Sequence, residues 1–328
     1  MRTRGWLIGA LAAGTIAAAV LAAGPARSAP AGSAAPAGSA GLAGSRSAAG
    51  PRGARVKLPL PFDNSCHPEA SLRPPAGAPR VTAGSDMARI RARGYLIAGV
   101  SESEYHQGFL NPLTGQIEGF DIDAVHQVAQ AIFGDPGKVR FVSLTDAGRI
   151  PALRSGAVDI VAQSMTINCA RLRQIDFSAV YFNDGQRVLV LKNSAVKGIA
   201  DLSRQRVCAT AGSTSVVDIK AANPAAIPVA VPYFTDCLVL LQQNQVAAVS
   251  TDGSILAGLA AQDPETQVVG PLFTIEPHGI GISQQNPDLV RFVNAVLARW
   301  IAGGGWAVSY DRWISAPAPA PPVAQYKD

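Results

Sequence analysis

Short apolar strands alternate with amphipathic helices through the central part of this 328-residue chain, and this alternation limits the fold more than any other feature. Leu96–Val100 and Val139–Ser143 have the composition of buried strands. Between them a helix is predicted to begin at Asp121, and the next helix is predicted at 149–155. Strands that alternate with helices in this way indicate an α/β fold with mainly parallel sheets.

A similar layout occurs twice, which predicts two lobes. Residues 153–161 (LRSGAVDIV) and 241–249 (LQQNQVAAV) are each typical of a helix end, a polar turn and a strand. After the second lobe the chain returns through a strand-like GIGIS and an amphipathic helix at 287–301. Two crossing strands would then form a hinge, with a cleft between the lobes. The predicted boundaries are 86–188 and 280–314 for lobe 1, and 189–279 for lobe 2.

The stretch SMTINCAR, from Ser164 to Arg171, directly follows a predicted buried strand. Ligands of open α/β sheets bind at the carboxyl ends of strands. A guanidinium matches a carboxylate through two parallel charge-assisted hydrogen bonds, and Ser164 and Thr166 can donate further bonds. We therefore predict that Arg171 holds the carboxylate of an amino acid; a solvated arginine on a loop is the alternative.

Both ends of the chain differ from this central part. Residues 1–29 begin with Arg2 and Arg4 and continue with an uncharged apolar run and small residues, which is typical of a signal peptide. The run also reaches the ~20 residues that a retained membrane anchor needs. Residues 30–85 predict a disordered linker, and residues 315–328 a flexible tail. The chain is therefore expected outside the cytoplasm, in the periplasm or cell envelope.

The charge balance gives no reason to expect nucleic acid as a partner. Of 28 Lys and Arg residues, three lie in the predicted leader, which leaves 25 against 23 acidic residues. No cluster of basic residues with interleaved aromatic residues occurs in the sequence.

Four cysteines in an exported chain predict two disulfides, for which three connectivities are possible. Cys208 lies in a predicted strand and Cys237 at the start of a predicted helix of the same lobe, so we expect these two to pair. Cys66 would then fasten the linker to Cys169, beside the proposed site. A zinc site is the alternative, but the sequence has no CxxC pair, and no metal site is predicted.

From about residue 94 to residue 314 the sequence resembles the family-3 periplasmic solute-binding proteins, the amino-acid receptors of ABC importers. The resemblance lies in GYLIAGV, GFDID, IPALRSGAVDIV, SMTINCARLRQIDFSAVY, RVCATAGSTS and VAAVSTDGSILAG, which keep the family's order and spacing. It implies a two-lobed periplasmic-binding-protein fold of type II, in a monomer without cofactor or catalytic residues. It also implies a free L-amino acid as ligand and a membrane permease as partner.

The resemblance implies roles for the residues of SMTINCAR. Arg171 matches the arginine that grips the ligand α-carboxylate, and Ser164 and Thr166 match its partners on the same strand end. Residues 168–170 (Asn, Cys, Ala) depart from the family's usual Thr, Pro or Asp, and Glu. A disulfide at Cys169 would pin this loop, so the departure concerns its fine geometry rather than the role of Arg171.

The resemblance implies further roles in lobe 2. Asp252 matches the acid that holds the α-ammonium group of the ligand. Ser213 and Thr214 match residues that close on the α-carboxylate, at a helix start whose free amides favour an anion. A helix N-cap is the other interpretation of Ser213.

The choice of amino acid depends on residues that differ within the family. Arg149 and Arg187 resemble the acidic-ligand group, and a second cation near the cleft would favour an acidic side chain. Against this, Ser101 replaces a further arginine of that group, and Glu102 and Glu104 would repel a carboxylate. We rank glutamate or aspartate first, then glutamine or asparagine, then basic amino acids.

Tyr105 and Phe109 are candidates to stack on the aliphatic part of the ligand, and packing in the core is their alternative role. Two other functions stay open. The chain could be a sensor domain that reports amino-acid levels to a membrane partner. It could also be an enzyme similar to the arogenate or prephenate dehydratases of this fold, in which His106 would be the histidine placed to reach the cleft.

Overall fold

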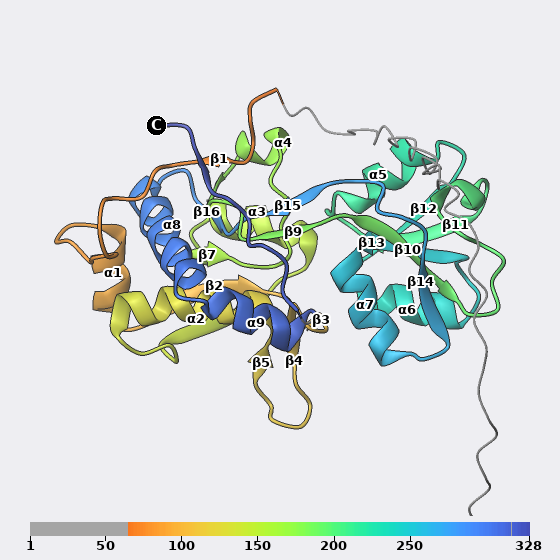
Figure 1. Ribbon diagram of the computed structural model, residues 1–328, viewed down its shortest axis with the longest axis horizontal. Coiled ribbons are helices and arrows are strands. Elements are labelled where there is room, and N and C mark those ends of the chain that lie inside the picture. The colour runs from red at the N-terminus through yellow and green to blue at the C-terminus, as the bar shows by residue number, and fades with distance from the viewer. Residues whose placement is uncertain (1–64, 316) are drawn as a thin grey trace, which may run out of the picture. The chain divides into compact units, whose positions relative to one another are not determined.

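In the computed structural model of the chain, which describes residues 65–315 and 317–328, each lobe is built on a five-stranded sheet (Figure 1). The sheet of lobe 1 has the strand order β6-β2-β7-β16-β8. Strand β2 is parallel to β6 and β7, whereas β16 is antiparallel to β7 and β8. The bounds are Leu96–Val100 (β2), Val139–Ser143 (β6), Ile160–Val161 (β7), Asp176–Phe177 (β8) and Gly281–Ile282 (β16).

Successive side chains of β2 point to opposite faces of this sheet, and helices cover both faces. Leu96 and Ala98 belong to the hydrophobic cluster that contains Phe120, and Ile97 packs against the cluster that contains Leu153. Ser85 begins the first helix by accepting a hydrogen bond from a backbone amide. The helices of lobe 1 are α1 (Asp86–Arg93), α2 (Phe120–Phe133), α3 (Arg149–Arg154), α4 (Cys169–Leu172), α8 (Pro287–Ala302), α9 (Gly305–Trp313) and the 3₁₀ turn η1 (Asp146–Gly148).

The sheet of lobe 2 follows the same plan, with the order β12-β11-β13-β10-β14. Strand β11 is parallel to β12 and β13, and β10 is antiparallel to β13 and β14. Val188 and Leu189 of β10 again enter different hydrophobic clusters. The elements are β10 (Gln186–Leu191), β11 (Arg206–Thr210), β12 (Ile227–Val231), β13 (Ala248–Asp252), β14 (Thr266–Val269), α5 (Ser215–Ala222), α6 (Phe234–Gln242), α7 (Gly253–Gln262) and the 3₁₀ turn η2 (Ile199–Leu202).

Two antiparallel strands carry the chain between the lobes. Strand β9 (Phe182–Asp184) leads into lobe 2, and β15 (Glu276–His278) leads back, with Asp184 opposite Glu276 (Figure 1). The two-lobed α/β fold with a two-strand hinge, which the sequence predicts, is therefore confirmed.

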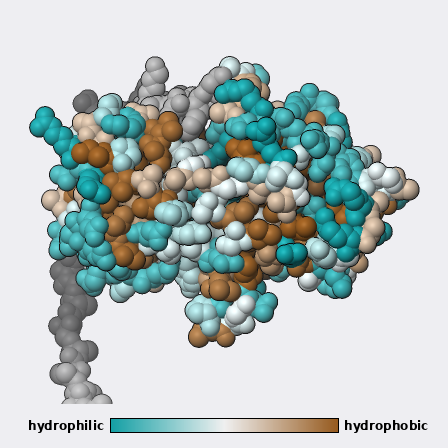
Figure 2. Space-filling view, turned by 180° about the vertical axis from the view of Figure 1, so that it is seen from behind, coloured by the Kyte–Doolittle hydropathy of each residue, from teal (hydrophilic) through white to brown (hydrophobic). Residues whose placement is uncertain are grey.

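A small three-stranded sheet projects from lobe 1 and consists of β3 (Ser103–Glu104), β4 (Gly108–Leu110) and β5 (Ile117–Glu118). Its outer end carries exposed apolar surface, to which Leu110 and Leu113 contribute (Figure 2). Gly119 connects this sheet to α2 with a φ of 139°, and a Cβ there would lie 2.3 Å from the Gln107 carbonyl oxygen. The close approach requires glycine.

Two disulfides fasten the fold. Cys208 in β11 is bonded to Cys237 in the first turn of α6, and Cys66 is bonded to Cys169, the first residue of α4. This is the connectivity that the sequence favours.

The described residues at both ends differ from the predicted linker and tail. Ala70–Ser71 (β1) pairs in parallel with Gln325–Tyr326 (β17), and the Asp328 carboxylate forms an ion pair with Arg291 of α8. The structure differs from the prediction here because composition shows only that these segments have few apolar side chains to bury. These segments are held by backbone pairing and by polar side chains such as Asn294, which donates to the Ser71 hydroxyl.

The leader predicted at 1–29 lies outside the described residues. Within 65–315 and 317–328, no helix is both long enough and apolar enough to cross a bilayer.

Candidate functional site

Arg171 stands in the first turn of α4, at the carboxyl end of the lobe 1 sheet. The Asn168 side chain accepts a hydrogen bond from the Arg171 amide at 2.9 Å, which fixes the start of this helix. The Arg171 guanidinium donates to the Thr166 carbonyl oxygen at 2.7 Å and to the Gly212 carbonyl oxygen of lobe 2 at 3.3 Å. The charged group therefore lies where the two lobes meet.

Arg171 is a buried cation without a counter-ion. Its residue is 8% exposed, and none of the ion pairs formed within the described part of the chain involves it. Burial, and then the nearby charge of Arg149, lowers the pKa of Arg171 to about 9. A carboxylate ligand would restore the interaction that this guanidinium loses with water, so the position favours an anion.

Lobe 2 presents a helix start to the same region. Helix α5 begins at Ser215, so the amides of its first turn have no partner within the helix. Ser213 precedes the helix and donates its hydroxyl to the Thr210 carbonyl oxygen at 2.8 Å. The N-cap position belongs to Thr214, whose hydroxyl lies 3.5 Å from that of Thr166.

Asp252 ends β13 and is a buried acid of lobe 2. One of its carboxylate oxygens lies 3.0 Å from Nε2 of His278, in the hinge strand β15. Burial raises the pKa of Asp252 to about 7, although the bond to His278 acts in the opposite direction. Burial lowers the pKa of His278, but the bond to Asp252 together with the charges of Asp252, Asp184 and Asp121 raises this pKa overall. A ligand ammonium group would favour the ionised form of Asp252.

One cavity lies between the lobes, and residues of both lobes line it. The structure brings most of the predicted ligand residues to it, from both lobes. Those at the cavity are Arg171, Asp252, Ser164, Thr166, Ser213, Thr214 and Arg149; Glu104, Asp146, Ser215, Phe234, Thr251 and Ile255 complete the lining.

The structure does not bring Arg187, Tyr105 or Phe109 to this cavity. Arg187 donates to the Gly270 carbonyl oxygen at 2.9 Å, within lobe 2. Tyr105 and Phe109 make an edge contact, and Phe109 packs in the same way on Trp313 of α9. Their predicted ligand contacts are corrected accordingly, because sequence position alone could not reveal these partners.

Arg149 reaches the cavity already paired. Its guanidinium lies 3.0 Å from the Asp146 carboxylate and donates to the Gln163 carbonyl oxygen at 2.8 Å. Asp146 was missed as a site residue, although it follows β6 and so obeys the same strand-end rule as Arg171. Among the described residues, no cluster of three or more His, Cys, Asp or Glu could hold a metal ion.

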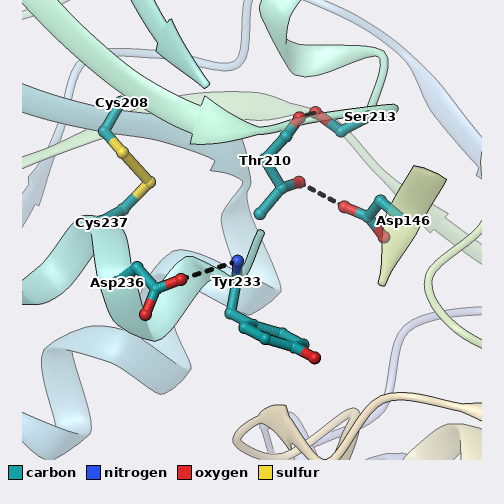
Figure 3. The surroundings of a disulfide bond; sticks show 7 residues. All are labelled: Asp146, Cys208, Thr210, Ser213, Tyr233, Asp236 and Cys237. Atoms are coloured by element: carbon teal, nitrogen blue, oxygen red, sulfur yellow. Dashed lines mark hydrogen bonds between the residues drawn. A yellow bond between two sulfur atoms is a disulfide. The ribbon is translucent and has the colours of Figure 1, made fainter. Parts of the chain in front are cut away.

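The lobes touch each other directly around the cavity. Figure 3 shows Asp146 of lobe 1 and Thr210 of lobe 2 pointing toward one another, with the Thr210 hydroxyl donating to the carboxylate. The Cys208–Cys237 disulfide lies in the same region of lobe 2. On α7, Gly258 faces the Tyr105 backbone so closely that a Cβ would lie 2.3 Å from its carbonyl oxygen.

We expect Gly258→Ala to oppose contact between the lobes. The added methyl group meets a backbone atom that cannot rotate away, and such overpacking costs about 1–3 kcal/mol. Ligand affinity should fall about tenfold, the equivalent of about 1.4 kcal/mol, in a calorimetric titration. The control is Ala257→Ser, at an exposed position of the same helix. Wild-type affinity in Gly258→Ala would show that this contact does not limit closure.

Two α/β lobes, a two-strand hinge and a charged cavity between the lobes define a binding protein of the periplasmic type II fold. The sequence matches the family of bacterial extracellular solute-binding proteins, family 3, over residues 96–316. The chain belongs to this family.

Several relatives have names that refer to the binding of glutamine or glutamate. The chain is 35% identical to the ABC transporter glutamine-binding protein GlnH of Bacillus subtilis, over 70% of this chain and 84% of that protein. It is 36% identical to the glutamine-binding protein of Geobacillus stearothermophilus, over 66% and 83%. The glutamate-binding protein GluB of Corynebacterium efficiens is 28% identical, over 68% and 78%.

Solved structures have the same fold. An ancestral arginine-binding protein bound to glutamine is 32% identical, with a TM-score of 0.63 over 67% of this chain and 98% of that one. The ancestral amino-acid-binding protein AncCDT-1, a precursor of cyclohexadienyl dehydratase, is 32% identical, with a TM-score of 0.65 over 70% and 100%.

Proposed function

We propose that this chain is the extracytoplasmic substrate-binding component of an ABC amino-acid importer. The observation that carries the proposal is that Arg171, a buried cation with no ion-pair partner among the described residues, lies in the same cavity as the buried acid Asp252. Arg171 binds the α-carboxylate of a free L-amino acid, with Ser213 and Thr214 on its other side. Asp252 binds the α-ammonium group, and a membrane permease receives the ligand.

Closure follows from the division of these two groups between the lobes. Arg171 belongs to lobe 1 and Asp252 to lobe 2, so only a closed protein can hold both charged ends of the ligand. A ligand shifts the equilibrium by its difference in contact between the two states. Charge-assisted hydrogen bonds contribute about 1.5–3 kcal/mol each, and several of them offset the cost of immobilising a small ligand.

The pairing of Arg149 changes the expected order of ligands. The sequence ranks glutamate or aspartate first, because Arg149 would meet a side-chain carboxylate. In the structure this guanidinium forms an ion pair with Asp146, and Glu104 adds a further acidic group to the cavity. We therefore place glutamine or asparagine before glutamate or aspartate. The names of the relatives from Bacillus subtilis and Geobacillus stearothermophilus, both glutamine-binding proteins, support this order.

A calorimetric panel of amino acids tests the proposal on the purified chain. We expect glutamine to bind at least about tenfold more tightly than glutamate, a difference of about 1.4 kcal/mol. Alanine, which has the same α-groups, is the control for the side-chain contribution. Tighter binding of glutamate would restore the order that the sequence suggests, and no binding of any amino acid would refute the proposed function.

We infer a binding protein that acts as a monomer, rather than an enzyme or a sensor. His106, the histidine expected to serve an enzyme of this fold, is not among the lining residues, and His278 is engaged by Asp252. The relatives quoted above carry the names of binding proteins, and one is named as part of an ABC transporter.

A further inference from the structure

The cavity has a second end, away from the groups assigned to the α-carboxylate and α-ammonium. Glu104, Asp146 and Phe234 line the cavity and also line a smaller one directly beside it. A ligand held at Arg171 and Asp252 can extend its side chain only along the remaining walls. Glu104, at the end of β3, is therefore placed to meet the far end of that side chain.

Glu104 is a buried acid without a cation of its own. It is 4% exposed, and its hydrogen bond within the described residues comes from the Ser164 hydroxyl at 2.9 Å. The one arginine close by, Arg149, is paired with Asp146. Asp121 lies on the other side, where its carboxylate accepts a hydrogen bond from the Ser164 amide. Among the described residues, the charges that act on the Glu104 carboxyl group are thus the two acids Asp146 and Asp121 and the cation Arg149.

From these contacts we propose that Glu104 selects the ligand side chain: its carboxyl group accepts a hydrogen bond from a carboxamide NH₂ and, when ionised, repels a side-chain carboxylate. The inference rests on the proposed function. A carboxamide supplies two N–H donors that an acidic wall can accept. A ligand carboxylate would instead add a further acid to the group of Glu104, Asp121 and Asp146, which Arg149 alone does not balance.

The proposal implies a dependence on pH. Burial first, and then the charges of Asp146 and Asp121, raises the pKa of Glu104 to about 8, while Arg149 lowers it. Glu104 is therefore mostly protonated at pH 7 and ionises as the pH rises above 8. Repulsion of a ligand carboxylate should grow over the same range.

The other charged groups near β3 do not confuse this dependence. Tyr181, which faces Asp121, has its pKa raised well above its ordinary value by burial and by that carboxylate. Helix α7 carries no charged residue, and on α6 the Asp236 carboxylate accepts the Tyr233 amide at 3.1 Å. Arg171, whose pKa burial lowers to about 9, titrates at the α-carboxylate end, and Asp252 and His278 titrate at the α-ammonium end; glutamine and glutamate share both ends.

The test is the ratio of the dissociation constants for glutamate and glutamine, measured at pH 7 and pH 9. The α-groups of the two ligands titrate alike, so they cancel in the ratio. In the wild type the ratio should rise about tenfold, because at one unit above its pKa Glu104 is about ten parts ionised to one part protonated. In Glu104→Gln the ratio should not change with pH. The matched control is Glu102→Gln, an exposed acid two residues away, which should behave as the wild type does.

Each outcome decides between the possibilities. A ratio that is flat in the wild type, or that rises equally in Glu104→Gln, overturns the assignment of Glu104 while leaving amino-acid binding in place. Wild-type protein that binds no amino acid at either pH overturns the proposed function, and the assignment with it. The two wild-type titrations decide the first point even if Glu104→Gln does not fold.

Discussion

Arg171→Ala should abolish measurable binding of every amino acid, with a loss of at least about a hundredfold, or about 2.7 kcal/mol. Removal of one partner of a buried, hydrogen-bonded charge pair costs about 2–5 kcal/mol, because the other partner is left buried and unpaired. Here that partner is the ligand α-carboxylate, which all amino acids carry. The loss should therefore be uniform across ligands in calorimetric titrations.

The stability of the ligand-free protein separates this role from a structural one. Arg171 has no carboxylate partner within the described part of the chain, so its replacement breaks no ion pair. The replacement also removes the free-energy cost of keeping this charge away from water. The free energy of unfolding should stay within about 1 kcal/mol of the wild type. Arg173→Ala, at an exposed position just beyond α4, is the control. Normal binding in Arg171→Ala would contradict the assignment of the α-carboxylate.

Loss of the Cys66–Cys169 disulfide should have the largest effect on stability. The bridge joins residues 103 positions apart, and a cross-link over a loop of that length stabilises by roughly 4 kcal/mol in the chain-entropy account. Cys66→Ser with Cys169→Ser should lower the free energy of unfolding by an amount of this order in urea titrations. Ligand affinity should also fall, because Cys169 begins the helix that carries Arg171.

The second disulfide provides the comparison. Cys208 and Cys237 are 29 positions apart and both belong to lobe 2, so their replacement should cost roughly 3 kcal/mol and should not affect the start of α4. If both double replacements changed affinity equally, the link between Cys169 and the position of Arg171 would be wrong.

The sequence predicts the layers of this fold well because the spacing of apolar residues along a strand or helix shows which of its faces is buried. The residues of β2 alternate between two faces, and both faces are covered by helices. The rule that ligands bind at the carboxyl ends of strands also predicts the place of Arg171, which lies at the cavity. The resemblance to a family added the pairing of Arg171 with Asp252, which no local pattern contains.

The remaining features depend on partners from distant parts of the chain. Arg149 looks like a free cation in the sequence, and only the structure shows that Asp146 already neutralises it. Phe109 is apolar and follows the first predicted strand closely, but in the structure it packs against Trp313, about two hundred positions later, and does not line the cavity. The pairing of β1 with β17 could not be predicted from composition, because it is made by backbone groups that every residue type carries.

That pairing has a mechanical consequence. Both outermost described strands rest on lobe 1, where the Ser71 hydroxyl donates to the Phe177 carbonyl oxygen and Asp328 meets Arg291. Lobe 2 is joined to the rest of the described chain through β9 and β15. Any opening of the cavity must therefore bend these two short strands and break contacts between the lobes such as Thr210 with Asp146.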